Sequence, residues 1–338
     1  MPCGIRLPRA TLKKILFILL IFTVQVPLSA QEGFFGGIGA WWAKRKADTL
    51  YVARAEHPFC IKARTTTVIN TYDTKWQEPA SNISLLARPT FKAGFHISYR
   101  WLGIGFQKDV GNLFNKSGEE NMELSASAYG RMLGGDFSYS TQSHYSINNF
   151  NGTICDKDIE GVKSRRIYAN GYFVFNNRKF SYPAALTQSY RQKRSCGSVI
   201  TGVSFFHNTL ELNPEALSAA TEGRIPATSI IQRSAYDCLN INCGYAYNWV
   251  PDSHWMLHGT ALPALSFMNR LEYRQDGSTF YRKNEINIGG IVRFGTLWNH
   301  KRYYAGFTAL MYIFGTRYNP MSMTDMYAKI QMSFGVRF

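Results

Sequence analysis

The 338-residue sequence has few charged residues, few prolines and, after residue 30, no apolar run near 20 residues. A transmembrane helix needs about 20 consecutive apolar residues, so this pattern excludes a polytopic helical membrane protein. Only 18% of the residues are charged, whereas 23 are phenylalanine and 20 are tyrosine. That aromatic content excludes a disordered chain, because disordered segments are poor in aromatic residues.

Acidic residues and cysteines are also scarce. The chain has 22 Asp and Glu against 38 Lys and Arg, a formal net charge of +16. We expect no nucleic-acid partner despite this charge, because no nucleic-acid-binding motif or basic helix occurs. Cys238 and Cys243 would face opposite sides of a strand, roughly 16 Å apart. With no CxxC spacing and no His/Cys cluster, the sequence predicts no metal site and no cofactor, and we interpret the cysteines as small apolar fillers.

The first thirty residues predict a secretory signal peptide. Four basic residues precede the apolar run 15–26, and small residues lead up to Ala30. This run of about 12 residues is too short for a membrane anchor, so we expect cleavage after Ala30. Gln31 follows in place of the cysteine that a lipoprotein would need. The predicted organisation is a signal peptide at 1–30, a periplasmic lead-in segment at 31–59 and a barrel domain at 60–338.

Strict alternation near the C-terminus carries the prediction of the fold. Over residues 326–338, apolar side chains such as Met326 and Phe334 alternate with polar ones such as Lys329 and Arg337. A transmembrane barrel strand of about ten residues needs this pattern, with apolar side chains toward lipid and polar ones toward the lumen. The final Phe338 resembles the C-terminal aromatic signature of bacterial outer-membrane barrels, which implies recognition by the barrel-assembly machinery during insertion.

The same alternation recurs upstream. We therefore predict an all-β fold, a transmembrane antiparallel up-and-down β-barrel of about 12 strands, since single-chain bacterial barrels have an even number. The clearest upstream strands cover 91–100, 122–129, 239–247, 285–294 and 303–313, and weaker candidates cover 61–69, 102–106, 137–141, 167–175, 199–205 and 255–267.

Connection lengths agree with a barrel whose N-terminus lies in the periplasm, because periplasmic turns are short and external loops are longer. Asn213 and Pro214 predict a short helix in one external loop. The connection 177–195 breaks the rule: it is either a folded periplasmic or plug element, or a sign that the strands are miscounted there. We expect short turns at 100–101, 132–134, 251–253 and 298–301, and longer loops at 71–89, 145–164, 208–233 and 269–283.

Aromatic residues gather near the predicted strand ends, as in the interfacial girdles of membrane proteins. A soluble β-sandwich core would also explain them, but the signal peptide, the terminal Phe338 and the alternating loops favour the girdle. Pro263 falls within a predicted strand, where proline removes a ladder hydrogen bond, and predicts a bulge or a strand end. The girdle candidates are Tyr99, Trp101, Trp249, Trp255, Trp298, Tyr303 and Tyr304.

We assign the polar faces of the predicted strands to the lumen, and the residues on those faces make the lumen basic. Rings of Lys and Arg in a pore favour anions, but buried charges need partners. We therefore expect either a packed or plugged interior, as in a structural envelope component, or a narrow conduit for small anionic solutes. The basic candidates are Lys62, Arg64, Lys92, Arg100, Arg131, Arg166, Arg293, Lys329 and Arg337, and the acidic partners are Glu123, Asp136 and Glu285.

An outer-membrane lipid hydrolase or acyltransferase is the rival class, and a structural or adhesive surface protein is a third. Such an enzyme needs a nucleophile within hydrogen-bond reach of a histidine. His258 and Ser266 share a strand face, as do His96 and Ser98, but same-face residues two apart on a strand are roughly 7 Å apart. Because no GxSxG elbow occurs either, we assign no catalytic residue and favour a role without catalysis.

Two stretches resemble a known family. One runs from Lys179 to Ser195 and the other from Gly244 to Pro263, with His57–Phe59 and Gly335–Phe338 extending the likeness. They resemble domain of unknown function 4421, an uncharacterised Bacteroidetes family of outer-membrane type. The resemblance implies a Gram-negative envelope protein and no activity. In the outer membrane, surface Lys and Arg would contact lipid and lipopolysaccharide phosphates. The motif positions are Phe180, Tyr182, Pro183, Gln188, Lys193, Arg194, Tyr247, Trp249, His254, His258 and Pro263.

Overall fold

The computed structural model describes residues 47–54, 57–76, 81–99, 101–111, 121–225, 227, 230–274, 279–317 and 321–338. The chain divides into two units, residues 1–46 and 47–338, and all described residues belong to the second. The predicted signal peptide, its cleavage after Ala30, most of the lead-in segment and Arg100 lie outside the described residues and stay predictions. Within the described ranges, no helix is both long and apolar enough to cross a bilayer.

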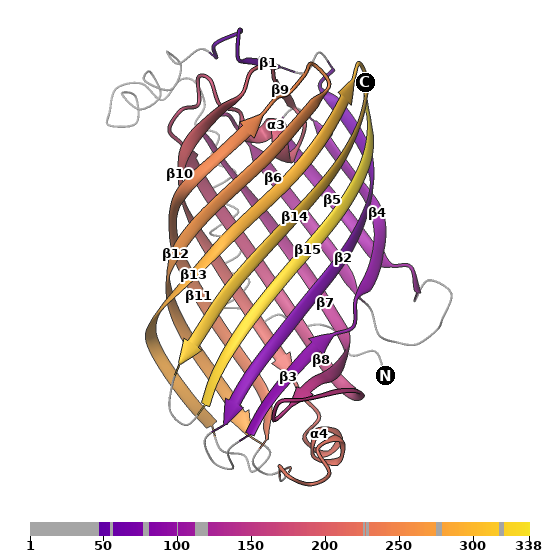
Figure 1. Ribbon diagram of the computed structural model, residues 1–338, viewed down its shortest axis with the longest axis vertical. Helices are drawn as coiled ribbons and strands as arrows, with labels where there is room; N and C mark the ends of the chain where they lie inside the picture. The colour runs from indigo at the N-terminus through magenta and orange to yellow at the C-terminus, as the bar shows by residue number, and fades with distance from the viewer. Residues whose placement is uncertain are drawn as a thin grey trace, which may run out of the picture. The chain divides into compact units, whose positions relative to one another are not determined.

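The described unit is a closed antiparallel β-barrel (Figure 1). Neighbouring strands run antiparallel, and the last strand pairs with the first large strand from Met321↔Trp76 to Arg337↔Cys60, which closes the ring. The predicted all-β up-and-down barrel is confirmed. The barrel strands are β2 (Phe59–Trp76), β3 (Ser81–Ala87), β4 (Thr90–Tyr99), β5 (Leu102–Asp109), β6 (Met122–Tyr129), β7 (Leu133–Phe150), β8 (Thr153–Val174), β10 (Cys196–Glu211), β11 (Ile231–Trp249), β12 (Trp255–Arg274), β13 (Thr279–His300), β14 (Tyr303–Arg317) and β15 (Met321–Arg337).

The two ends of the barrel differ in their number of strands. At the end that carries Phe338, the ring reads β15-β14-β13-β12-β11-β10-β8-β7-β6-β5-β4-β2, the twelve strands that the sequence predicts. At the opposite end β3 alone joins β2 to β7, so the ring has ten strands. We call the twelve-stranded end the plug end and the ten-stranded end, beside helix α4 (Pro214–Ala220), the far end. Because barrel diameter grows with strand number, the plug end has more interior to fill.

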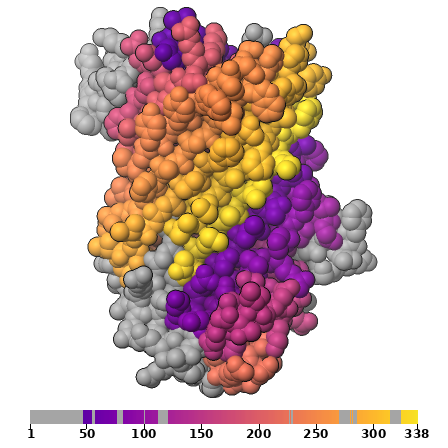
Figure 2. All heavy atoms as spheres, in the orientation of Figure 1, coloured from indigo at the N-terminus to yellow at the C-terminus, as the bar shows by residue number. Residues whose placement is uncertain are grey.

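The outer face of the barrel is apolar. Side chains such as Phe95, Ile104 and Ile288 are between 65% and 83% exposed, on the faces that the alternation predicts. The outer wall over β12 to β15 and β2 is continuous in Figure 2. A soluble monomer rarely exposes contiguous apolar surface larger than a few hundred Å². This exterior is the one that transmembrane barrels present to lipid.

The far-end connections correct part of the loop prediction. The ranges 145–164 and 269–283 were expected to be loops, but most of each is strand, because β7, β8, β12 and β13 run 18 to 22 residues. In 145–164 apolar side chains such as Ile147 and Ile159 face inward and most exposed residues are polar. Register irregularities near His144 and Asn148 also interrupt the period of two, so this stretch lacks the outward apolar face that marks a lipid-facing strand. The β7–β8 connection is the tight turn Asn151–Gly152, with φ values of 51° and 86°. The predicted helix after Asn213 is confirmed as α4.

Two residues near the plug end depart from their predicted positions. Tyr304 was expected in the aromatic girdle but is fully buried and faces inward, whereas its neighbour Tyr303 is 50% exposed. Pro263 was expected to mark a bulge or a strand end but lies inside β12, in regular register with Gly290. On its other side no pairing occurs between Asn242↔Ala264 and Tyr245↔Ala261, so the ladder accommodates the missing donor without a register shift. All five cysteines in the described unit are free.

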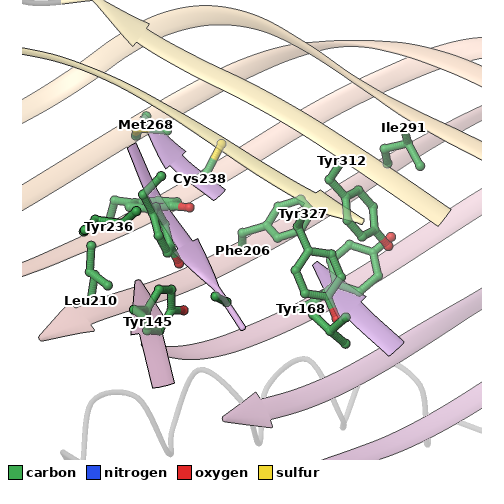
Figure 3. Packing of buried hydrophobic residues seen from close by; sticks show 14 of the residues in the cluster. Tyr145, Tyr168, Phe206, Leu210, Tyr236, Cys238, Met268, Ile291, Tyr312 and Tyr327 are labelled. Carbon is green, nitrogen blue, oxygen red and sulfur yellow. The ribbon is translucent and has the colours of Figure 1, made fainter. Parts of the chain in front are cut away.

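The barrel interior is a packed core in its far half. Buried side chains from almost every strand form one cluster that includes Tyr72, Tyr145, Leu210 and Tyr236, and Leu217 of α4 packs against it from outside the ring. Nearer the middle, the rings of Tyr168, Phe206, Tyr312 and Tyr327 pack against one another in tilted and edge-on arrangements (Figure 3). The far half of the barrel is therefore filled by side chains of its own strands.

Candidate functional site

A buried ion pair ties opposite walls of the far half together. The Arg166 guanidinium on β8 contacts the Asp325 carboxylate on β15 with N–O distances of 2.7 and 3.0 Å. Tyr236 donates its hydroxyl hydrogen to the same carboxylate, and Arg166 stacks 4.2 Å from the centre of the Tyr327 ring. Asn208 donates to the Tyr72 and Tyr236 hydroxyls at 2.8 and 2.9 Å. This Arg–Asp–Tyr network crosses the lumen at the level where a conduit would need open space.

Two more predicted cations are neutralised across the lumen. The Arg293 guanidinium lies 3.5 Å from the Asp136 carboxylate, which also accepts a hydrogen bond from Asn170. Lys329 forms an ion pair with the fully buried Glu123. Lys92, also fully buried, donates to the Thr141 carbonyl at 3.2 Å. These contacts cross-link the barrel wall.

The plug end is filled by a separate stretch of chain, residues 175–195, which we call the plug segment. It holds helix α3 (Tyr182–Leu186) and the short strand β9 (Tyr190–Gln192). Ser181 caps α3 by accepting a hydrogen bond from the Ala184 amide, and Pro183 occupies the first turn, as expected for a helix start. Phe180 and Tyr182 are at most 1% exposed. Of the alternatives for the anomalous connection 177–195, the structure shows a folded plug.

The plug segment docks on the second resembling stretch. Asn248 on β11 donates to the Ser181 carbonyl at 2.9 Å and to Gln192 Oε1 at 3.2 Å. His258 on β12 donates from Nδ1 to Asn248 Oδ1 at 2.7 Å, and its ring lies 5.5 Å from that of Tyr182. The two stretches that carry the family resemblance are thus two sides of one contact.

Gln192 and Gln188 hold the plug segment from within. Gln192 is 4% exposed, accepts from the Ser181 amide, and donates to the carbonyls of Lys179 and Arg194 at 2.6 and 2.9 Å. Gln188, at a left-handed φ of 62°, accepts a 3.1 Å hydrogen bond from the buried Lys62 ammonium. No carboxylate of the described residues pairs with Lys62, so the plug amide is the partner of this buried cation.

Two spaces flank the plug tip. Inside, a chamber of about 130 Å³ is lined by Thr187 together with Arg64, His96, Arg293 and Lys329. Both ring nitrogens of His96 are buried without a protein partner. A polar chamber of this size has room for several water molecules, which would supply those hydrogen bonds.

Outside the plug tip lies a larger space of about 1120 Å³, which we call the basic cleft. Gln188 lines it from the plug side. Strand β1 (Val52–Arg54), paired with β9, forms part of its wall. None of its described lining residues is acidic. The Lys, Arg and His residues that line it are Arg54, His57, Arg191, Lys193, His254, His300, Lys301, Arg302 and Arg337.

The remaining predicted residues lie at various places. Arg131 sits in the β6–β7 turn and donates to the Asn177 carbonyl at the edge of the plug segment. Glu285 is half-buried on β13, next to the exposed Ile286. Tyr247 and Trp249 face outward on β11, and Arg194 lies on the exposed side of the plug with its guanidinium 5.9 Å from the Tyr51 ring.

The candidate catalytic pairs do not form a dyad. His258 also accepts a hydrogen bond from Thr260 at 2.7 Å, so both ring nitrogens hold structural partners. Ser266 donates to Asn240 at 2.5 Å. No group of three or more potential metal ligands occurs among the described residues. In the β11–β12 turn, the backbone N–H groups of His254 and Trp255 hydrogen-bond to Asp252 and lower the pKa of its carboxyl group.

Asp325, the central acid of the far-half network, was missed in the sequence. The strict alternation that marked β15 begins at Met326, but Asp325 continues the same polar face as Tyr327 and Lys329. Extending the alternating pattern by one residue toward the N-terminus would have identified Asp325 as a lumen-facing residue. Gln192 and Asn248, which hold the plug, carry no local signal because they pair across 56 residues of sequence.

Comparisons with known proteins agree on family and leave activity open. Residues 46–338 match the family model described as "Domain of unknown function (DUF4421)". No curated protein matches the sequence.

Similar solved structures include three bacterial proteins. Ail, the attachment invasion locus protein of Yersinia pestis, has 7% identity and a TM-score of 0.25, covering 81% of this chain and 98% of that chain. The Pseudomonas putida toluene transporter TodX has 7% identity and a TM-score of 0.31, covering 83% and 90%. The translocator domain of autotransporter NalP from Neisseria meningitidis has 8% identity and a TM-score of 0.32, covering 83% and 88%. These TM-scores carry no conclusion, so the topology rests on the strand register. Because the family model spans the whole barrel, the chain belongs to the DUF4421 family.

Proposed function

We propose that this protein is an outer-membrane β-barrel of a Gram-negative bacterium that is closed to solutes and acts as an envelope component through groups at its plug end. The apolar outer face supports the membrane placement, because the strands present exposed Phe, Ile and Leu where lipid would lie. The predicted signal peptide is consistent with export. A Bacteroidetes origin stays a prediction.

The filled lumen is the observation that carries the proposal. The Arg166–Asp325 network and the aromatic cluster occupy the far half, and the plug segment occupies the plug end. A solute would have to displace both. Removing either partner of a buried ion pair leaves the other charge unpaired at low dielectric, which is strongly unfavourable, so spontaneous opening of the far half is not expected.

The proposal also covers the surroundings of the barrel. Outer-membrane lipid would contact the apolar belt, and lipopolysaccharide phosphates would contact Lys and Arg at the far end. The barrel-assembly machinery would recognise the exposed Phe338 ring, which lies 6.2 Å from that of Phe59. Crosslinking from Phe338 during insertion would test the last of these partners.

Electrical recording in planar lipid bilayers tests the closed state. The full mature protein is expected to give no steady conductance. A second form, in which a Gly-Ser linker replaces residues 178–194, is also expected to stay silent, because the far half is closed independently. Open channels in the unmodified protein would overturn the proposal.

A gated conduit for small anions is the second candidate, and the chamber behind the plug tip favours it. Arg64 and Arg293 line this chamber, and one Lys62–Gln188 hydrogen bond links the plug tip to the wall. If the linker form conducts with anion preference while the unmodified protein is silent, the conduit replaces the closed barrel as the best account.

A further inference from the structure

The basic cleft concentrates positive charge that no described lining residue compensates. Six Lys and Arg side chains line it, and none of its described lining residues is Asp or Glu. In the lumen, by contrast, Arg166 and Arg293 each face a carboxylate. A concave surface lined by one sign of charge focuses the electrostatic potential and attracts counter-ions. An anion from outside the chain would compensate this charge.

Arg337 gives the cleft a fixed anchor. Its side chain is buried, its guanidinium lies 4.6 Å from the centre of the Tyr304 ring, and its Nη2 donates to Asn299 at 2.6 Å. Its Nε has no protein partner, and no carboxylate of the described residues forms an ion pair with it. A buried guanidinium held in place with a free donor suits a planar or tetrahedral oxyanion.

The position of the cleft narrows the choice of anion. Tyr303 lines the cleft and also belongs to the outward apolar face of β14, and the Trp298 and His300 rings stack 5.8 Å apart at the end of β13. Amphipathic aromatic rings of this kind mark the level of the lipid headgroups. The cleft thus opens where the apolar belt ends, beside the phosphate layer of the surrounding leaflet.

We infer that the basic cleft binds the phosphate headgroup of an anionic phospholipid from the leaflet around the plug end. This inference rests on the proposed membrane placement and names the partner of the plug end. The acyl chains would lie along the outer face below Tyr303, and the phosphate would reach the Lys301–Arg302 turn and Arg337.

Lipid retention measured by native mass spectrometry tests the inference. The full mature protein is reconstituted in nanodiscs of equal parts phosphatidylglycerol and phosphatidylcholine, released, and its bound lipids are counted. The cleft variant combines Lys301→Asn with Arg302→Gln; asparagine suits the positive φ of 49° at position 301. The control variant, Arg178→Gln with Arg194→Gln, removes two exposed charges from the same end outside the cleft.

The expected result is a phosphatidylglycerol preference that falls roughly tenfold or more in the cleft variant and is unchanged in the control variant. Heat-dependent gel mobility establishes that all three proteins are folded. Equal retention of both lipids by the unmodified protein would overturn the inference. So would displacement of the lipid by millimolar inorganic phosphate or by a glutamate-rich peptide, because the cleft would then bind soluble anions. If the unmodified protein gives no conductance in the bilayer recording, the proposed closed barrel stands whatever the lipid-retention result. Failure of the lipid inference can therefore be distinguished from failure of the proposed function.

Discussion

At the far end, ten strands enclose a core made by their own side chains, whereas at the plug end twelve strands enclose a separate segment of chain, residues 175–195. The difference follows from width. A narrower ring lets side chains from opposite walls meet, as Arg166 and Asp325 do. Where the β5–β6 hairpin widens the ring, the walls need an insert, and the long β8–β10 connection provides it.

The two regions also differ in how they depend on the rest of the fold. The far-half network joins β8, β10, β11 and β15, so it forms only when the ring closes. The plug segment forms a helix and caps it with its own Ser181, then docks through Asn248 and Gln192. Substitutions in the far half should therefore change the free energy of unfolding of the whole barrel. Substitutions in the plug segment should change only how often the plug opens locally.

The substitution Asp325→Asn should have the largest effect. It leaves the Arg166 charge buried without a counter-charge, and breaking a buried pair in this way costs about 3–5 kcal/mol. Urea unfolding in detergent micelles measures the loss. The matched control is Asp158→Asn, which breaks the exposed Arg88–Asp158 pair and should cost about 0–1 kcal/mol. Equal losses in the two variants would contradict the assignment of the far half as the structural core.

Phe180→Ala should loosen the plug while the barrel stays closed. The ring is fully buried. Truncating a buried Phe costs about 3–5 kcal/mol, and we expect this loss in the free energy of docking the plug segment into the barrel. Hydrogen exchange should rise at amides 180–192 and remain unchanged in β8 and β15. Phe175→Ala, which removes a 52% exposed ring from the same segment, serves as control. If exchange rises equally across the barrel, plug and wall unfold as one unit.

The sequence predicted the barrel better than its contents. Alternation with period two depends only on neighbouring residues, so β4, β11 and β15 could be placed with their apolar faces outward. Where a strand runs beyond the apolar belt, as in 145–164, the outer face is polar, the apolar residues face inward, and irregularities in the register interrupt the period of two, so the signal is lost. Tyr304 is a different case: the alternation with the outward Tyr303 already turns its ring inward, and the girdle prediction failed because it used aromatic type and position without that alternation.

The site could be predicted only in part. The cations of the polar faces were found by register, but their partners depend on which strands meet across the lumen. Lys329 reaches Glu123 over 206 positions of sequence, and Lys62 reaches Gln188 over 126. The basic cleft combines β1, β9, the adjoining loops and the ends of β13 and β15. His300, Lys301 and Arg302 are adjacent in the sequence, but the other charges join them only in the folded barrel.

Gln192→Ala should have an intermediate effect on plug stability. It measures how much the buried hydrogen bonds contribute to plug docking, apart from the apolar contacts. The change leaves the Ser181 amide and the carbonyls of Lys179 and Arg194 without this partner, and unsatisfied buried groups cost about 1–3 kcal/mol. Protease cleavage within 178–194 should accelerate accordingly. The control is Gln232→Ala, an exposed glutamine on β11. Similar cleavage rates in both variants would show that apolar contacts alone hold the plug.

Gly152→Ala should have the smallest effect and should act on the far end alone. Gly152 has a φ of 86° in the β7–β8 turn, and a Cβ added there meets no atom within 4 Å. The cost is therefore one of backbone conformation, about 1–2 kcal/mol for a left-handed non-glycine residue. Gly171→Ala within β8 is the matched control, since its Cβ also meets nothing and it has no left-handed φ. That control should be neutral or stabilising by about 0.4–1 kcal/mol, because alanine restricts the unfolded chain. The urea midpoint should fall for Gly152→Ala and should stay or rise for Gly171→Ala; an equal fall in both would mean that the tight turn does not determine the far-end register.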